Sequence, residues 1–230
     1  MTIVVEFLGL PGIGKSTLSR RAAMELTNQH SSVSEPIRQI DDRPALYRIL
    51  SKARFAAKNH IQNSRNALAT TRSIRAVDPG STTDLLRVAF NLHYVIGVAA
   101  QTRSTPGVTL LDQGLYQGIW SVGLHSPSDW SHLFDQFDDL LTRAAPDLVV
   151  LVEADNETIA DRLRSREDGN TRFTPDSPRF DRGVEGYEVL KKRLQSDDDT
   201  PRSIVVTNET RDNLDAGVNQ VVEAVRSLPD

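Results

Sequence analysis

The residues with the most specific chemistry lie near the start of the chain, in the run GLPGIGKS at positions 9–16. The run matches the pattern G-x-x-x-x-G-K-[ST], in which a glycine-rich loop turns its backbone N–H groups toward nucleotide phosphates. Lys15 would bridge the outer phosphates, and the hydroxyl group of Ser16 would bind Mg²⁺, with Thr17 assisting. The predicted nucleotide-binding residues are Gly9, Pro11, Gly12, Ile13, Gly14, Lys15, Ser16 and Thr17. The alternative is a glycine turn that merely connects a strand to a helix.

Two carboxylates stand where metal or acid–base chemistry could take place. Asp112 directly follows the apolar run VTLL, and Glu35 precedes a proline that favours an extended approach. Because ligands bind beyond the C-terminal ends of parallel strands, Asp112 is predicted to face the phosphate loop and to bind Mg²⁺ or accept a proton from an acceptor hydroxyl. Glu35 would be the general base if a second strand ends there. The alternatives are a helix N-cap aspartate and a solvated loop glutamate.

A cluster of arginines follows in the run ADRLRSRED, before a loop rich in Gly and Pro. On a helix, Arg162 and Arg166 are four residues apart and adjacent, whereas Arg164 points elsewhere. Phosphoryl transfer needs cations to balance the charge that moves between donor and acceptor oxygens, and arginines on a closable loop supply them. The three are therefore candidate catalytic residues. The alternative is a solvated face that pairs with neighbouring acidic residues.

These side chains need a scaffold, and apolar runs separated by helix-length sequence predict strands of a parallel sheet joined by crossover helices. The predicted strands occupy 3–8, 108–111, 148–152 and 203–206, with a further short strand ending near position 35. The predicted helices occupy 15–29, 45–57, 82–102, 130–144, 157–166, 184–195 and 214–227. The fold class is therefore α/β: one domain over residues 1–230, in three α/β/α layers around a five-stranded parallel sheet.

Two segments do not fit the regular alternation. Residues 36–77 lie between the second and third strands, and our working hypothesis is that they form the pocket for the acceptor. Residues 168–183 combine Gly, Pro, Asp and Arg with few apolar residues, which is typical of a mobile surface loop. Together with the last arginines of the cluster, this loop is predicted to form a lid at about residues 164–183.

Composition excludes several classes of function. The formal net charge of −4 gives no global attraction to nucleic acid or to an anionic membrane, so neither is an expected partner. The absence of cysteine excludes disulfides, a thiolate nucleophile and a cysteine-rich zinc site, which fits an intracellular protein. The first apolar run ends at Gly9, so no signal peptide is expected, and no run reaches the ~18 apolar residues of a spanning helix. We expect a soluble, cytoplasmic protein.

The order of GLPGIGKS, SEP, LLDQGLYQG, PDLVVLVEAD and RLRSRE resembles the thymidylate kinase and deoxynucleoside kinase branch of the P-loop kinases over nearly the whole chain. The resemblance implies a P-loop NTPase fold of the nucleotide kinase type, with ATP and Mg²⁺ as cofactors. Glu35 maps to the family glutamate that acts near the acceptor hydroxyl, and Asp112 to the acidic residue beside Mg²⁺. Arg162 maps to the lid arginine that stacks on adenine, and Arg164 and Arg166 to those that clamp phosphates.

The chain departs from the family pattern on the acceptor side. Gln113 and Gly114 follow the acidic residue where the family normally has arginine, so a usual contact to the acceptor phosphate or base is missing. The helix at 82–102 lacks the arginine and aromatic arrangement of a thymidylate binder and offers instead Phe90, Asn91, His93, Tyr94 and Gln101. These side chains either line an acceptor pocket or belong to an ordinary helix, and for Phe90 we favour the latter.

The function that these observations favour is transfer of the γ-phosphoryl group of ATP to a hydroxyl or phosphate of a small acceptor, such as a nucleoside or nucleotide. One alternative is a nucleotide-dependent switch or hydrolase, but the N-K-x-D element that reads guanine is missing. The others are a kinase of a non-nucleotide small molecule and a catalytically silent nucleotide-binding protein. The expected partner is the small acceptor, and a homodimer is possible.

Overall fold

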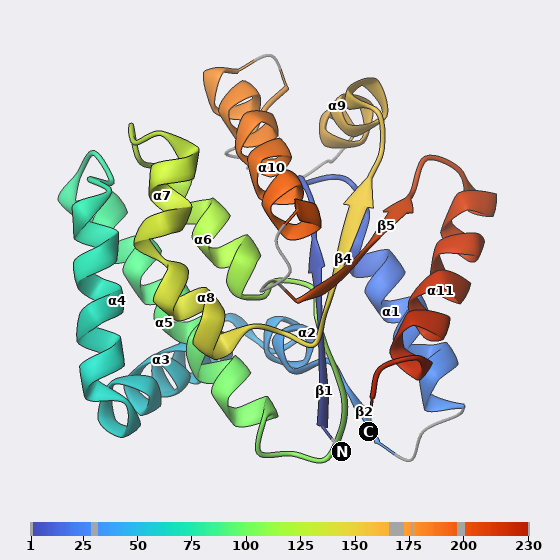
Figure 1. Ribbon diagram of the computed structural model, residues 1–230, viewed down its shortest axis with the longest axis horizontal. Coiled ribbons are helices and arrows are strands. Elements are labelled where there is room, and N and C mark those ends of the chain that lie inside the picture. The colour runs from blue at the N-terminus through green and yellow to red at the C-terminus, as the bar shows by residue number, and fades with distance from the viewer. Residues whose placement is uncertain (1, 29–31, 166–172, 176, 197–200, 230) are drawn as a thin grey trace.

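The computed structural model describes residues 2–28, 32–165, 173–175, 177–196 and 201–229, and a parallel five-stranded sheet forms its centre (Figure 1). The strand order is β2-β3-β1-β4-β5, which confirms the predicted α/β class and its parallel sheet. The strands are β1 Thr2–Leu8, β2 Val33–Ser34, β3 Gly107–Leu111, β4 Leu148–Glu153 and β5 Arg202–Thr207. Each lies within two residues of a predicted strand.

The central strands are apolar because both of their faces are covered. Every residue of β4 from Leu148 to Val152 is buried, and so are all but the first residue of β1. This continuous burial is typical of a parallel sheet between two helical layers. The register sets Glu6 opposite Leu111 and Leu8 opposite Leu151, so these strands end side by side. Whatever follows each strand therefore meets at one edge of the sheet.

Helices cover both faces of the sheet, which gives the predicted three layers (Figure 1). Helices α1 (Lys15–Thr27) and α11 (Arg211–Arg226) pack together on one face. The other face carries α5 (Thr82–Thr102), α6 (Leu115–Gly123) and α10 (Pro178–Ser196). The remaining helices are α2 Pro36–Asp41, α3 Ala45–Gln62, α4 Ser64–Ala76, α7 Trp130–Gln136, α8 Asp138–Ala144 and α9 Asn156–Arg164. Within the described part of the chain, no helix combines the length and apolarity needed to cross a membrane.

The structure corrects three of the predicted elements. The single helix predicted at 130–144 is broken at Phe137, whose buried ring packs into the core and turns the chain between α7 and α8. The segment 36–77, which did not fit the regular alternation, is almost entirely helical, as α2, α3 and α4. Residues 178–183 were predicted as loop but form the start of α10, because Phe180 and Gly183 are buried there against the core. Most of the predicted lid before them, 166–172 and 176, lies outside the described residues.

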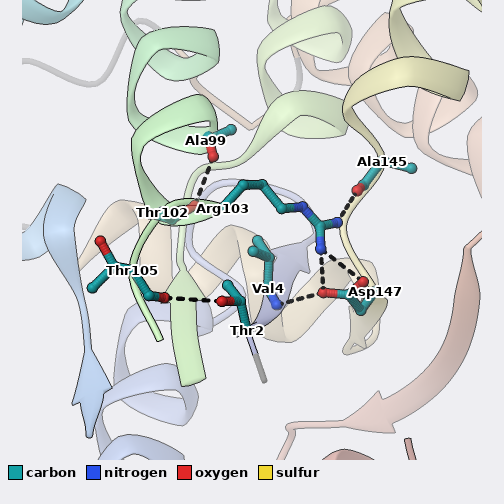
Figure 2. A network of polar contacts seen from close by, with 8 residues as sticks. All are labelled: Thr2, Val4, Ala99, Thr102, Arg103, Thr105, Ala145 and Asp147. Carbon is teal, nitrogen blue, oxygen red and sulfur yellow. Dashed lines mark hydrogen bonds and ion pairs between the residues drawn. The ribbon is translucent and has the colours of Figure 1, made fainter. Parts of the chain in front are cut away.

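A network of polar contacts holds the N-terminal half of β1 in place (Figure 2). The carboxylate of Asp147 accepts a hydrogen bond of 2.7 Å from the Val4 backbone N–H and two of 2.8 Å from the guanidinium group of Arg103. Arg103 also donates to the carbonyl group of Ala145, just before β4. This cluster, the Arg103–Asp147 network, joins the end of α5 to two neighbouring strands.

Candidate active site

The loop after β1 has the geometry of a phosphate cradle. Gly12 and Gly14 have φ values of 90° and 95°, in the left-handed region that side chains disfavour, so glycine is needed at both positions. Helix α1 begins directly afterwards, so the positive end of its dipole faces this loop. The ammonium group of Lys15 donates to the carbonyl oxygens of Gly9 at 2.6 Å and Leu10 at 3.1 Å, and therefore lies over the loop.

Residues from the last strand and from α9 brace the same loop. The amide Nδ2 of Asn208 donates to the Ile13 carbonyl oxygen at 2.7 Å. The guanidinium group of Arg162 donates to the carbonyl oxygens of Ile13 at 3.2 Å, Asn208 at 2.8 Å and Glu209 at 2.9 Å. Sequence reasoning missed Asn208, although its place directly after the apolar run of β5 was a usable signal. Arg162 is thus a fixed part of the loop's support.

Asp112 lies beside the loop, as its position after β3 predicted. Its Oδ2 accepts a hydrogen bond of 2.9 Å from the Ser16 hydroxyl group. Its Oδ1 is buried and has no hydrogen-bond partner within the described protein. A hydroxyl group and a carboxylate oxygen without a partner, next to an anion cradle, fit the hard oxygen ligands that Mg²⁺ prefers.

One cavity of about 660 Å³ joins the phosphate loop to helices α5 and α6. Its polar lining beyond the loop consists of Arg87, Asn91, Asp112, Gln113, Gln117, Ser121, His125 and Arg179. Its apolar lining consists of Val88, Phe90, Val95, Trp120, Leu124 and Phe173. A cavity of this size, with both polar and apolar walls, is large enough for a small organic ligand.

The cavity lining bears on two expectations. Phe90 is 43% exposed and lines the cavity, which supports the alternative to the ordinary helix residue that we favoured. None of the described lining residues of this cavity comes from residues 36–77, but a second hollow of about 630 Å³ beside Ser16 and Asp112 is lined by Arg38, Asp41 and Asp42 of that segment. The hypothesis that the segment forms the acceptor pocket therefore stays a prediction.

Glu35 directly follows β2, and its side chain contacts α1 through Ser19. Its carboxylate accepts hydrogen bonds of 3.3 Å from the Ser19 hydroxyl group and 2.6 Å from the guanidinium group of Arg38. Burial raises the pKa of Glu35, and the nearby Asp112 raises it further, while Arg38 acts in the opposite direction. Glu35 lines a hollow of about 240 Å³ with Arg20 and Arg38, which shares no described lining residue with the main cavity.

Comparisons with known proteins identify the fold that carries this site. No protein-family model matches the chain, and no curated protein matches it. The structure of deoxyadenosine kinase from M. mycoides with dCMP and dCDP bound is 13% identical, with a TM-score of 0.57 over 98% of this chain and 100% of that one. Thymidylate kinase from Ehrlichia chaffeensis is 17% identical, with a TM-score of 0.52 over 97% and 98%. Thymidylate kinase from Candida albicans is 16% identical, with a TM-score of 0.56 over 98% and 92%.

The chain has the nucleoside and nucleotide kinase fold. This confirms the fold that the resemblance of the sequence implied. Within this kinase fold, the loop, Asp112 and the cavity all lie at the C-terminal edge of the sheet, where open α/β sheets bind their ligands.

Three of the polar candidates on α5 lie away from the cavity of this kinase fold. His93 is buried between Asn59 at 3.2 Å and Thr71 at 2.9 Å. Burial and the neighbouring His60 lower its pKa to about 4, so it is neutral at physiological pH and joins α3, α4 and α5 together. Tyr94 is buried against Phe55, and Gln101 accepts a hydrogen bond of 3.3 Å from Lys58. Asn91 does line the cavity.

The arginines that were predicted to act together occupy different surroundings. Arg162 holds the phosphate loop, whereas Arg164 donates a hydrogen bond of 2.9 Å to Asp161 on the exposed side of α9. Arg166 lies outside the described residues. Arg179, which the sequence placed in the lid, lines the cavity from the first turn of α10.

A metal cluster made by the protein alone does not occur in the described part of the kinase fold, where no group of three or more His, Cys, Asp or Glu side chains could hold an ion. A P-loop site needs no such cluster, because the nucleotide phosphates supply most of the ligands. Ser16 and Asp112 are the residues whose oxygens are placed to complete that ligand set.

Proposed function

We propose that the protein is an ATP-dependent phosphotransferase that moves the γ-phosphoryl group to a hydroxyl or phosphate of a nucleoside or nucleotide. The observation that carries this proposal is the cavity of about 660 Å³ that joins the phosphate loop to an acceptor-sized hollow between α5 and α6. The M. mycoides kinase with this fold binds deoxynucleotides, among them dCMP and dATP, which supports the same class of acceptor. A nucleotide switch would not need the second half of such a cavity.

The loop residues bind and orient the donor. Backbone N–H groups of the loop and of the first turn of α1 surround the phosphates, and phosphate oxygens replace the two carbonyl oxygens to which Lys15 now donates. Asn208 and Arg162 keep the Ile13 carbonyl group pointing away from the phosphates, because both donate to it. Positioning and charge balance supply most of the rate in phosphoryl transfer, so a rigid loop is itself a catalytic device.

Ser16 would hold Mg²⁺ through its hydroxyl group, and Asp112 through the carboxylate whose Oδ1 has no hydrogen-bond partner in the described protein. When bound, the ion would neutralise charge that develops on the phosphate oxygens. Glu35 is the candidate general base, because a raised pKa brings a carboxylate nearer to the pH at which it must accept a proton. Asp112 is the alternative base, since it lines the acceptor cavity and Glu35 does not.

The cationic residues have separate roles in the proposal. Arg162 contacts the bound nucleotide from the edge of the loop that it supports. Arg164 and Arg166 approach the phosphates from the end of α9 and the segment between α9 and α10, after Arg164 leaves Asp161. On the acceptor side, Arg179 supplies the charge that Gln113 cannot, because Gln113 stands where the family normally has arginine.

The proposed enzyme works in the cytoplasm, where ATP is abundant, and it forms a homodimer. The support for a dimer is an apolar face on α3, where Leu46, Tyr47, Ile49 and Leu50 are 57% to 67% exposed. Exposed apolar side chains gathered on one helix mark a surface that another protein covers. Light scattering on the purified chain tests the dimer, and Leu50→Arg would return it to a monomer.

The first experiment is a coupled assay of ADP release with Mg·ATP and a panel of nucleosides, nucleoside monophosphates and small hydroxyl metabolites. We expect acceptor-dependent turnover with one or more nucleosides or nucleotides. Lys15→Ala should reduce it by about 10³-fold or more, because the charge beside the transferred phosphoryl group is lost. The matched control is Lys58→Ala, since Lys58 contacts Gln101 far from the loop. Turnover only with other metabolites would change the acceptor class, and acceptor-independent ATP hydrolysis would indicate a switch or hydrolase.

A further inference from the structure

A glutamate lies inside the central strand, where the sequence pattern predicts only apolar residues. Glu6 is 1% exposed and stands between Val5 and Phe7, which are fully buried. It is paired in register with Leu111, the last residue of β3 before the catalytic candidate Asp112. A buried carboxylate costs stability unless something compensates it, so its presence in the core calls for an explanation.

The carboxyl group of Glu6 serves as the missing N-cap of α6. The N-cap residue of that helix is Gly114, which has no side chain to accept a hydrogen bond. Instead, Glu6 Oε1 accepts a hydrogen bond of 2.8 Å from the backbone N–H of Gln117, and the N–H groups of Leu115 and Tyr116 also interact with the carboxyl group. A Cβ atom at position 114 would clash with the Glu6 carboxyl group. The glycine therefore makes room for a cap that comes from another strand.

Helix α6 connects this cap to the candidate active site. The side chain Oε1 of Gln117 accepts a hydrogen bond of 3.3 Å from the N–H of Gly9, the first residue of the phosphate loop. Gln117, Gly118, Trp120, Ser121 and Leu124 of the same helix line the cavity. Gly9 follows Glu6 by three residues, so the contacts form a closed circuit from β1 through α6 and back to the loop.

One atom of this circuit has no partner. Glu6 Oε2 is buried and makes no hydrogen bond in the described part of the protein. Burial raises the pKa of Glu6 to about 7, while the three backbone N–H groups act in the opposite direction. A residue kept only for stability would be served better by an apolar side chain of the same size. The carboxyl group is therefore retained for what it holds in place.

We propose that Glu6 is a positioning residue, which caps α6 from the neighbouring strand and so fixes Gln117 and the acceptor side of the cavity against the phosphate loop. This inference rests on the proposed function for its kinetic readout. Glu6 itself is buried beneath the cavity and does not line it. Its effect on turnover passes through α6.

The test compares Glu6→Leu with Glu6→Gln. Leucine removes the acceptor of the helix cap without leaving a large cavity, whereas glutamine keeps a carbonyl oxygen at the position of Oε1. We expect Glu6→Leu to unfold within a few degrees of the natural chain, because removal of a costly buried carboxyl group offsets part of the loss of the helix cap. The variant should lose about 10- to 100-fold in kcat/KM for the acceptor, because a small misplacement suffices for such a loss. The KM for ATP should change by less than about threefold, and Glu6→Gln should recover most of the loss.

A second pair of variants tests the same contact from α6. Gly114→Ala forces the new Cβ atom against the Glu6 carboxyl group, so it should impair acceptor turnover as Glu6→Leu does. Gly114→Ala combined with Glu6→Ala removes that clash, so the double variant should lose less than the product of the two single losses. Hydrogen exchange followed by mass spectrometry gives a readout without turnover: Glu6→Leu should speed exchange in peptides that cover 115–118 and leave those of β4 unchanged.

Each outcome decides the inference. If Glu6→Leu lowers the unfolding temperature, ATP binding and turnover together, and Glu6→Gln rescues none of them, Glu6 is only structural and the proposal is overturned. Unchanged exchange at 115–118 in Glu6→Leu also overturns it. If the natural chain turns over no acceptor at all, the proposed function fails. Hydrogen exchange at 115–118, and the unfolding temperatures of the single and double variants, still decide whether Glu6 fixes α6.

Discussion

The two ends of β1 treat their polar groups in opposite ways. At the Arg103–Asp147 network, both carboxylate oxygens of Asp147 are occupied by donors from the chain itself (Figure 2). At the other end, Glu6 Oε2 and Asp112 Oδ1 are buried without partners, and the loop between them holds two glycines at positive φ. Unsatisfied groups and backbone strain gather where a ligand acts. One end of the strand is built for stability and the other for chemistry.

The largest effect on this difference between the two ends of β1 is expected from Asp112→Asn, at the C-terminal end. An amide keeps the shape of the carboxylate but removes the charge that we propose to hold Mg²⁺, so acceptor turnover should fall by about 10²- to 10³-fold. The unfolding temperature should stay within a few degrees, because Asp112 is half-buried and an amide oxygen can still accept the hydrogen bond from Ser16. The measurement is turnover as a function of Mg²⁺ concentration, beside thermal unfolding of the same sample. A large loss of stability would mean that Asp112 belongs to the structural end of the contrast.

A smaller effect is expected from a change of pH, which should alter the free energy of unfolding through Glu6 at the same end of β1. The pKa of Glu6 is about 7 in the folded protein and near the ordinary 4.5 when unfolded. The folded state therefore binds the proton more tightly, and the free energy of unfolding should fall as pH rises from about 4.5 to about 7, by on the order of 3 kcal/mol. Glu6→Gln should remove this part of the pH dependence. Denaturant unfolding at pH 5 and pH 8 measures the difference in the free energy of unfolding between the two pH values. If this difference is the same in the natural chain and in Glu6→Gln, the buried, protonatable carboxyl group is contradicted.

The smallest effects are expected at the stable end. Asp147→Ala should lower the free energy of unfolding by about 1–3 kcal/mol, because the Val4 N–H loses its acceptor as well as Arg103 its partner. Arg103→Ala should cost less than about 1 kcal/mol, since this ion pair is more than one-third exposed and solvent screens it. Acceptor turnover should be unchanged in both variants. Urea unfolding and the coupled assay test this, and a loss of turnover would mean that the two ends are not separate.

The sheet was predictable because its strands are continuous apolar runs that end at polar residues. β3 and β4 matched their predicted ranges to within one residue, since they are buried on both faces and Thr109 is the one buried polar residue in the two strands. Helix α5 matched its range 82–102 in full, because Ser81 caps its start by accepting from the Asp84 N–H at 3.1 Å. Pattern and cap here agree on the same boundary.

The acceptor side was less predictable, because it depends on which helices meet. Helix α6 was missed: its residues from Leu115 to Gly123 are nearly all buried, so no polar face marks a helical period. The braces on the phosphate loop were also missed, since Asn208 acts through one backbone carbonyl group that is far away in sequence. Arg162 was selected for a lid role, and only the fold shows that it supports the loop. Spacing predicts contacts within an element but not between elements.

The bond between Asn208 and the Ile13 carbonyl group spans 195 residues, and it has a consequence for how the molecule is made. A chain that emerges from its N-terminus presents the phosphate loop first, yet the side chains that support the loop's shape arrive with α9 and β5. Contacts of such long sequence separation form late, because the intervening chain must first be ordered. The proposed nucleotide site is therefore completed only when nearly all of the sheet is in place, so binding of a nucleotide there would report a finished fold.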